Sequence, residues 1–354
     1  MGKKSVKTEL VTIRELDKDA AWIRRAGQIL REGGLVAFPT ETVYGLGGDA
    51  LNPRSSQKIY EAKGRPSDNP LIVHICRRED LGTITSHIPE GAVKLAEKFW
   101  PGPLTMVLPR SDRVPRETTG GLDTVAVRMP DHKVALALID AAGGYVAAPS
   151  ANTSGKPSPT LAKYVMEDMD GRIEMILDGG PVGIGLESTI VDMTSEVPTI
   201  LRPGYITQEM LEQTLGRVET DRALLSPDSG QPPRAPGMKY RHYAPAGELT
   251  VVSGQQDAVV EWINDRLRRR QAEGKRTGVI CTEATKDRYL ADRVKNAGKR
   301  DDEAEIAREL YRILREFDDE QVEVIYSEAF DTAGMGQAVM NRLLKAAGYH
   351  VENV

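Results

Sequence analysis

The chain has 354 residues, of which 40% are apolar, and a formal net charge of −5. This length allows two cored domains, because a single hydrophobic core stops growing below roughly 300 residues. The acidic balance excludes the overall basic field that nonspecific nucleic-acid binding needs. The two cysteines, Cys76 and Cys281, form no CxxC pair, and no stretch approaches the roughly 18 apolar residues of a membrane span. We therefore expect a cytoplasmic protein without a disulfide framework, a structural zinc site or a membrane segment.

The first two hundred residues alternate helical stretches with short apolar runs. Apolar spacing predicts helices over about 17–32, 53–62 and 91–99. The apolar runs are four to seven residues long, rich in β-branched residues and bounded by Gly or Pro, which favours strands over buried helix. They are LVAFPT, LIVHI, TMVLP, TVAVRM, YVAAPS, MILDG and TIVDM. This order predicts an α/β sheet domain over residues 8–215.

A proline-rich segment follows this domain. Residues 216–246 contain LSPDSGQPPRAPGMKYRHYAPA, whose five prolines withhold the backbone donors that regular structure requires. We interpret this segment as a linker.

Residues 247–354 return to an α/β pattern. We predict strands at LTVVSG, TGVICT and VEVIYSEAF, a helix ending near Ala272, two helical stretches with Arg and Glu faces, and a final helix at NRLLKAAG. This order predicts a smaller, mostly parallel, Rossmann-like domain. DTAGMGQAVMNRL, at 331–343, lacks a preceding long apolar strand and is interpreted as the start of an ordinary helix. A nucleotide-binding or regulatory role for this domain stays open.

The segment FPTETVYGLGGDA, residues 38–50, places three hydroxyl side chains and three glycines at a strand end. One reading is a ligand-facing rim, in which Thr40, Thr42 and Tyr44 present hydroxyls and the glycines allow close backbone approach. The other is a glycine-rich turn that closes a hairpin. The chain contains neither a GxGxxG dinucleotide fingerprint nor a GxxxxGK[ST] phosphate loop.

Two cations stand in AKGRPSDNPLIVHI. Lys63 and Arg65 suit a polyphosphate if the loop bends around it, but their spacing alone also fits a solvated surface pair. His74, in the apolar run that follows, fits a core histidine as well as a ligand-binding one.

Polar loops follow further apolar strands. Ser150, Asn152 and Ser158 in YVAAPSANTSGKPSPT offer donors for phosphate or ribose oxygens, although a plain polar loop would look the same. Arg128 in TVAVRMPDH requires a counter-charge if buried, from a ligand or from an internal aspartate. Ser188 in GLESTIVDM and Arg202 in ILRPG form a fourth cluster. No GxSxG or HExxH motif and no paired cysteines occur, which disfavours covalent and zinc catalysis.

Taken together, the motifs resemble a known family. PTETVYGLGGDA, KGRP-x3-PL, VAVRMPDH, SANTSG, and ESTIVD followed by RPG match the YrdC-like threonylcarbamoyl-AMP synthases over about Thr12 to Gln208. APGMKYRHYAP, at 235–245, resembles the linker signature of the two-domain form, except that Ala235 stands where serine is usual. The resemblance implies a twisted mixed sheet in the first domain and a linker that folds over the active site.

The resemblance also implies a reaction. Threonine is carboxylated by bicarbonate or CO2, and the carbamate attacks the α-phosphate of ATP to give threonylcarbamoyl-AMP and pyrophosphate, for modification of the adenosine next to the anticodon in tRNA. Positioning and charge stabilisation at the phosphates by Lys63 and Arg65 suffice for this chemistry, without a protein nucleophile. Mg2+ is expected with ATP, with no protein ligands assigned.

The implied site residues fall into two sets. Those expected at ATP are Lys63, Arg65, Asn69, Thr124, Ser150, Asn152, Ser158, Arg202, His242 and Tyr243. Those expected at threonine are Thr40, Thr42, Tyr44, His74, Arg128 and Ser188. Tyr240, His242 and Tyr243 form a lid hypothesis.

The implied partner is a tRNA threonylcarbamoyl transferase complex that receives the product, while direct tRNA binding is left open. The alternatives are an RNA-binding module with a YrdC-like fold and no catalysis, and an enzyme that adenylates carbamoyl phosphate. The acidic composition weakens the first of these, and missing zinc-finger cysteines weaken the second.

Overall fold

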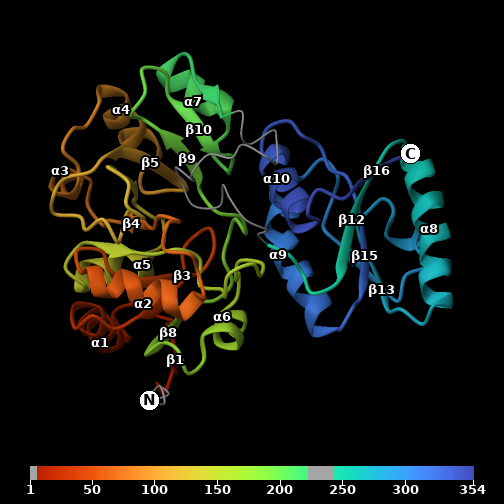
Figure 1. Ribbon diagram of the computed structural model, residues 1–354, viewed down its shortest axis with the longest axis horizontal. Coiled ribbons are helices and arrows are strands. Elements are labelled where there is room, and N and C mark those ends of the chain that lie inside the picture. Colours follow the sequence, from red (N-terminus) through yellow and green to blue (C-terminus); the bar gives the residue numbers. More distant parts are fainter. Residues whose placement is uncertain (1–5, 222–242) are drawn as a thin grey trace. The chain divides into compact units, whose positions relative to one another are not determined.

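The computed structural model describes residues 6–221 and 243–354, which divide into two units (Figure 1). Among these residues the first unit comprises 6–154, 158–183 and 187–221, and the second comprises 155–157, 184–186 and 243–354. Both units are α/β, as predicted. The prediction of a linker over 216–246 falls largely outside the described residues.

The first unit is built on one mixed sheet. Its strand order is β1-β8-β2-β3-β7-β4-β6-β5-β9-β10-β11, with parallel and antiparallel neighbours, and this confirms the predicted mixed-sheet fold. The strands are β1 (Glu9–Thr12), β2 (Val36–Phe38), β3 (Gly45–Asp49), β4 (Ile72–His74), β5 (Leu104–Pro109), β6 (Thr124–Arg128), β7 (Val146–Ala147), β8 (Met175–Asp178), β9 (Thr189–Asp192), β10 (Thr199–Arg202) and β11 (Glu219–Thr220). All seven predicted apolar runs form strands.

Helices cover both faces of this sheet. The helices are α1 (Ala20–Arg31), α2 (Pro53–Lys63), α3 (Leu81–Ile84), α4 (Glu90–Phe99), α5 (Lys133–Ala141), α6 (Ala162–Met169) and α7 (Gln208–Leu215), with a 3-10 turn η1 (Arg78–Asp80). Apolar residues of α1 and α5 form one core cluster with alternate residues of β2 and β8. Those of α2, α4 and α6 form another cluster with the intervening strand residues. The alternation of side chains along each strand therefore supplies two cores from one sheet.

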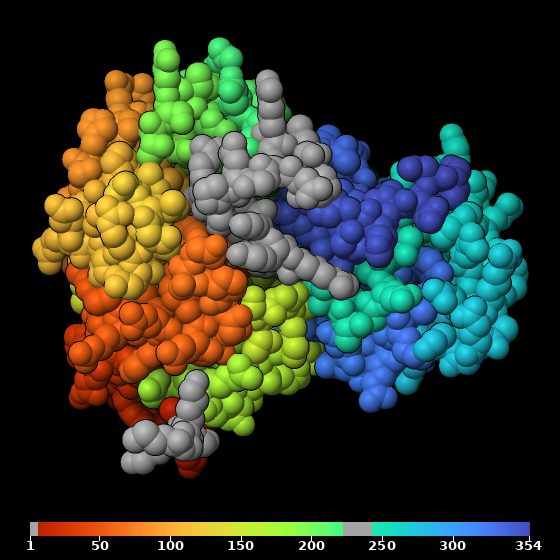
Figure 2. All heavy atoms as spheres, viewed as in Figure 1, coloured from red at the N-terminus to blue at the C-terminus, as the bar shows by residue number. Residues whose placement is uncertain are grey.

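Helix α2 illustrates how the sequence sets its own boundaries. Asn52 accepts a hydrogen bond from the amide of Arg54 (3.0 Å), and Pro53 occupies the first helical position. Both are favoured at a helix start. Gly64 ends the helix in the left-handed region at φ 61°, where glycine carries no Cβ penalty. The helix lies at the surface of the unit (orange in Figure 2), and its last residue is Lys63.

The second unit contains a five-stranded parallel sheet. Its order is β14-β13-β15-β12-β16, and every neighbouring pair is parallel. The elements are β12 (Glu248–Ser253), α8 (Gln256–Ala272), β13 (Thr277–Cys281), the 3-10 turn η3 (Lys286–Arg288), β14 (Arg293–Asn296), α9 (Glu303–Asp319), β15 (Val324–Glu328), α10 (Gly336–Ala346) and β16 (Val351–Asn353). Helix α8 covers one face of the sheet, whereas α9 and α10 cover the other (Figure 1).

One expectation for the second unit is wrong. We predicted two helical stretches between β13 and β15, but the first of them is replaced by η3 and the edge strand β14. Strand β14 has only intermediate or exposed residues, so no buried apolar stripe marked it in the sequence. The second stretch is α9, whose Asp302 cap accepts from the amide of Glu305 (2.9 Å).

Each unit has its own packed tryptophan. Trp100 is 5% exposed, and its Nε1 donates to the carbonyl of Leu104 (2.7 Å). Trp262 on α8 lies edge-on to Tyr326, with ring centroids 5.8 Å apart. Both indoles therefore help to fix the helices of their own unit onto a sheet.

Candidate active site

The central strands of the first unit bring His74 and Arg128 side by side. These residues end β4 and β6, which are parallel neighbours, and they are register partners. Arg128 also pairs with Thr105 on the antiparallel strand β5. The carboxyl ends of parallel strands share one edge of a sheet, where ligand sites commonly form.

The loop from β2 to β3 supplies hydroxyl groups to the same edge. Arg128 donates from a terminal guanidinium nitrogen to Thr42 Oγ1 (3.0 Å), and the hydroxyls of Thr42 and Thr40 are 2.9 Å apart. Thr40 also hydrogen-bonds the backbone of Val43, which holds the loop in a tight turn. Both threonines are buried, so their hydroxyls belong to a preformed cluster.

The counter-charge of Arg128 is an internal carboxylate, one of the two possibilities that the sequence left open. It comes from Glu41, whose Oε1 lies 2.7 Å from the Arg128 guanidinium, rather than from an aspartate. The side chains of Glu41 and Arg128 are 13% and 5% exposed. A charge pair this deeply withdrawn from water interacts more strongly than a surface pair.

Ser188, which directly precedes β9, and Arg202, which ends β10, join this cluster. Ser188 Oγ lies 2.7 Å from Thr105 Oγ1 and accepts from Arg202 (3.2 Å). Arg202 Nε also donates to the Ser188 carbonyl (3.0 Å). Thr105 therefore connects the Ser188–Arg202 pair to the strand that flanks Arg128.

His74 is a buried neutral imidazole at this edge. Burial lowers its pKa to about 3, and the Arg128 charge acts in the same direction, while contacts with backbone groups oppose the shift. Its Nδ1 lies 3.1 Å from the Ile72 carbonyl. A neutral His74 can donate one hydrogen bond and accept another but adds no charge beside Arg128.

A second group of predicted residues gathers around Lys63. The Lys63 ammonium at the end of α2 is 2% exposed and donates to the carbonyls of Ser150 and Asn152. The amide of Ser154 donates to the Lys63 carbonyl (2.8 Å), and Ser150 bridges to Gly45 of β3. The polar loop after β7 is therefore fastened to α2 and to β3.

Arg65 and Asn69 lie on the loop after α2. The Arg65 guanidinium donates to the carbonyls of Asn69 and Pro70, each at 3.3 Å. Asn69 is 1% exposed, and its Oδ1 is buried without a hydrogen bond from the described residues. Ser158 donates to Glu187 (2.6 Å), which joins the two loops that precede α6 and β9.

Thr124 lies apart from Arg128. It begins β6, four residues before Arg128, which corresponds to about 13 Å along a strand. Tyr243 lies in the second unit, where its ring stacks on Tyr311 of α9 with centroids 5.2 Å apart. Tyr240 and His242 lie outside the described residues, so the ATP and lid roles expected of them and of Tyr243 stay predictions.

Tyr44 and the glycines of the 38–50 segment are engaged within the protein. Tyr44 is fully buried, and its hydroxyl donates to the Gly180 carbonyl (2.7 Å), while its role at threonine stays a prediction. The glycines form β3 and serve close packing within the protein. A Cβ on Gly47 would lie 2.9 Å from Val146 Cγ1 and 3.0 Å from Phe38 Cε1.

Sequence reasoning missed three polar residues of this edge, namely Glu41, Thr105 and Glu187. Glu41 stands between the two threonines of PTET, where its position was a usable signal. Thr105 lies in an otherwise apolar run and Glu187 in a hydroxyl-rich loop, so only strand pairing and contact reveal them.

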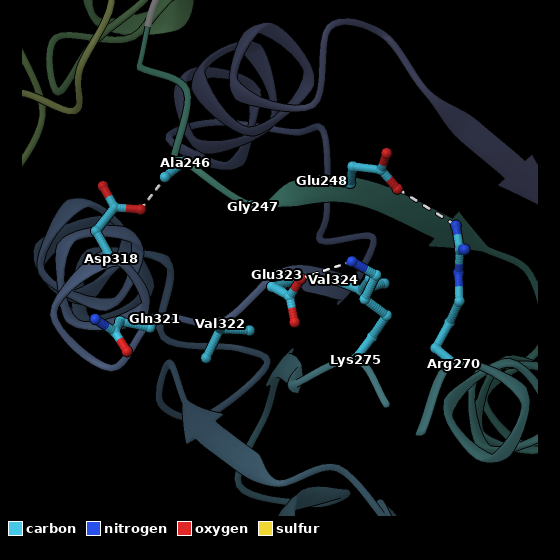
Figure 3. A pocket seen from close by; sticks show the side chains of 10 residues that line it. All are labelled: Ala246, Gly247, Glu248, Arg270, Lys275, Asp318, Gln321, Val322, Glu323 and Val324. Carbon is cyan, nitrogen blue, oxygen red and sulfur yellow. Dashed lines mark hydrogen bonds and ion pairs between the residues drawn. The ribbon is translucent and has the colours of Figure 1, made fainter. Parts of the chain in front are cut away.

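A cavity of about 470 Å³ lies elsewhere, in the second unit (Figure 3). Its charged side chains are engaged with one another: Glu248 with Arg270, and Glu323 with Lys275. Asp318 accepts from the amide of Ala246 (2.7 Å), and burial raises the pKa of its carboxyl. No residue of this cavity was predicted to bind a substrate.

Two further features are absent from residues 6–221 and 243–354. No helix there has the length and apolarity needed to cross a membrane. No group of three or more His, Cys, Asp or Glu side chains in those ranges is arranged to hold a metal ion.

Comparison with known proteins matches nearly the whole chain. Residues 28–204 match the family described as "Telomere recombination", and residues 206–348 match "Threonylcarbamoyl-AMP synthase, C-terminal domain". A threonylcarbamoyl-AMP synthase of Pyrococcus abyssi is 50% identical over 98% of this chain and 100% of its own length. The Bacillus subtilis protein of that name is 49% identical over 95% of this chain and 96% of its own.

A solved structure agrees with these matches. The crystal structure of P. abyssi Sua5 complexed with L-threonine superposes with a TM-score of 0.91 at 50% identity, covering 98% of this chain and 99% of that one. The fold, both domain matches and the sequence identity agree over both units. The chain therefore belongs to the two-domain family of threonylcarbamoyl-AMP synthases.

Proposed function

We propose that this protein is an L-threonylcarbamoyladenylate synthase, a nucleotidyltransferase that makes threonylcarbamoyl-AMP and pyrophosphate from L-threonine, bicarbonate or CO2, and ATP. The observation that carries the proposal is about 50% identity over both units to two synthases, together with the threonine complex of the P. abyssi protein. A noncatalytic RNA-binding role is not favoured by these relatives.

The reaction divides the described cluster into two regions. The threonine ammonium first loses a proton to solvent; the free amine then forms a bond to the carbon of CO2 and releases a second proton, and an oxygen of the resulting carbamate attacks the α-phosphorus of ATP. The bond from that phosphorus to the bridging oxygen breaks, and pyrophosphate leaves. We assign threonine to Thr40, Thr42, His74, Arg128 and Ser188. We assign ATP to Lys63, Arg65, Asn69, Thr124, Ser150, Asn152, Ser158 and Arg202.

The charges of the cluster support this division. Arg128 is the cation that the threonine set offers to a carboxylate, and its planar fork suits bidentate binding. Lys63 is the last residue of α2, and Arg65 lies two residues further along the chain. Both cations can stabilise charge on phosphate oxygens. The neutrality of His74 leaves Arg128 as the only positive charge on the two paired strand ends of β4 and β6.

We also propose that Mg2+ accompanies ATP and screens its triphosphate. Since no cluster of three metal-binding side chains occurs in the described ranges, we expect phosphate oxygens and water to supply most ligands. The two free cysteines support a cytoplasmic location. Handover of the product to a tRNA threonylcarbamoyl transferase complex remains part of the proposal.

Pyrophosphate release tests the function directly. Purified protein with ATP and Mg2+ should release pyrophosphate only when both L-threonine and bicarbonate are present, and serine should not replace threonine. Arg65→Ala should lower the rate about 100-fold, as expected when one charge-stabilising donor is lost. The exposed Arg113→Ala serves as the matched control and should keep the wild-type rate.

The possible outcomes separate the parts of the proposal. Absence of threonine-dependent release would refute the synthase function. Release that Arg65→Ala leaves unchanged would keep the function and remove Arg65 from the triphosphate site.

A further inference from the structure

The contact between Glu41 and Arg128 leaves several buried polar atoms without hydrogen bonds. Both carboxylate oxygens of Glu41 and the Nε of Arg128 are buried, and no residue that the structure describes hydrogen-bonds them. The 2.7 Å approach of the two side chains is an ion pair that lacks hydrogen-bond geometry. The charge of Glu41 also acts on the nearby His132 imidazole. The Nδ1 of His132 is buried and has no hydrogen-bond partner in the described ranges.

Unsatisfied buried groups of this kind are unusual. More than about nine in ten buried polar groups in proteins have a hydrogen-bond partner, because an unpaired one keeps its full desolvation cost. Here the atoms without hydrogen bonds belong to a carboxylate and a guanidinium that contact each other as an ion pair. Together they give this buried edge one negative and one positive group with hydrogen-bonding capacity that no described residue uses.

An α-amino acid is complementary to this pair. Its ammonium and carboxylate are attached to the same carbon, so the two opposite charges stand as close together as the ends of the Glu41–Arg128 pair. The ammonium offers three N–H donors, which match the unpaired oxygens of Glu41, whereas the carboxylate matches the Arg128 fork. A simple carboxylate ligand would satisfy Arg128 but would meet repulsion from Glu41.

We propose that Glu41 is the residue that receives the α-ammonium group of threonine, and that it selects for an α-amino acid over other carboxylic acids. This inference rests on the proposed function, which places threonine at Arg128. Thr42 Oγ1 accepts a hydrogen bond from the same terminal nitrogen of Arg128 that lies 2.7 Å from the Glu41 carboxylate. The Glu41 carboxylate therefore remains the anionic end of the site.

Two ligands that differ only in the amino group provide the test. L-Threonine and its 2-hydroxy analogue, 2,3-dihydroxybutanoate of the same configuration, are titrated into the full-length protein by calorimetry. Wild-type protein should bind the analogue at least about 10-fold more weakly, because the charge-assisted bonds to Glu41 are lost. Equal affinity for the two ligands would overturn the proposal without any variant.

Glu41→Gln then assigns the discrimination to one side chain. The variant should bind L-threonine about 10- to 100-fold more weakly than wild type and change the affinity for the analogue less than about threefold. If Glu41 only held Arg128 in place, both ligands would change by the same factor, and the proposal would fail. Glu97→Gln makes the same charge change at an exposed position of α4 and should leave both affinities unaltered.

Further outcomes keep the inference separate from the proposed function. Absence of L-threonine binding to wild-type protein would refute the proposed function itself. Binding that Glu41→Gln does not weaken would refute the role of Glu41 alone. If Glu41→Gln fails to fold, as judged by its melting temperature, Glu41→Asp is tested in its place. This variant keeps the negative charge on a shorter side chain. It should lower the affinity for threonine more than the affinity for the analogue.

Discussion

The buried neutral state of His74 predicts a specific loss of stability in mild acid. In the unfolded chain this imidazole takes up a proton near its ordinary pKa of 6.5, whereas in the folded protein burial and the Arg128 charge hold the pKa at about 3. Between these values the unfolded state binds more protons than the folded state. The free energy of unfolding therefore rises with pH in this window, and the contribution of His74 is lost as the pH falls.

The magnitude follows from the linkage relation. Protonation of His74 in the unfolded state alone stabilises that state by about 0.8 kcal/mol at pH 6 and about 2.1 kcal/mol at pH 5. Between pH 6 and pH 5 this contribution changes by about 1.2 kcal/mol. The value holds for any folded-state pKa of His74 well below 5. It should appear as an extra loss of unfolding free energy in wild-type protein relative to His74→Gln over this single pH unit.

Equilibrium urea unfolding at pH 6.0 and 5.0 measures this difference. His74→Gln removes the titration, so its unfolding free energy should fall less between the two pH values, whatever its absolute stability. His87→Gln, at an exposed position, is the matched control and should follow wild type. If wild type and His74→Gln lose equal stability from pH 6.0 to 5.0, then His74 is not held neutral by the fold.

Two further predictions concern stability. Gly47→Ala should destabilise the protein by about 1–3 kcal/mol, because the added Cβ would lie within 3.1 Å of Val146, Phe38 and the Val36 carbonyl. Gly82→Ala is the control in the same urea assay, since a Cβ at Gly82 would have no heavy atom within 4 Å. Equal stability of these two variants would contradict the packing argument. Asn52→Ala should cost about 1 kcal/mol through loss of the α2 cap, whereas Asn52→Asp retains an acceptor oxygen and should cost less. Melting temperatures that do not separate the two Asn52 variants would show that the cap contributes little.

The sequence was sufficient for the strands that carry apolar side chains. Runs such as LIVHI and TVAVRM became β4 and β6 because their β-branched residues are buried on both faces of the sheet. Strand β3 was not predicted, because GLGGD has almost no side chains with which to show a period. The edge strand β14 was misassigned for a related reason, since its residues remain partly exposed and show no apolar alternation.

The sequence predicted which types of residue form the candidate site, but not which of these residues contact one another. Arg128 required a counter-charge, and the sequence could not specify which carboxylate supplied it. The hydrogen bond between Thr105 and Ser188 joins residues 83 positions apart in the chain. Such contacts depend on the order β4-β6-β5-β9, in which β4 lies beside β6 and β5 beside β9 although neither pair is consecutive in the sequence. Strand order, more than local propensity, therefore determines which polar side chains meet.

The placement of the tryptophans has a spectroscopic consequence. The chain has three, of which Trp22 is 36% exposed, while Trp100 and Trp262 are packed within different units. Because indole emission shifts when the ring enters water, a protein that retains only Trp100 or only Trp262 reports on one unit at a time. The chain thus has an intrinsic optical label for each half, with which the order of their unfolding can be followed without an added dye.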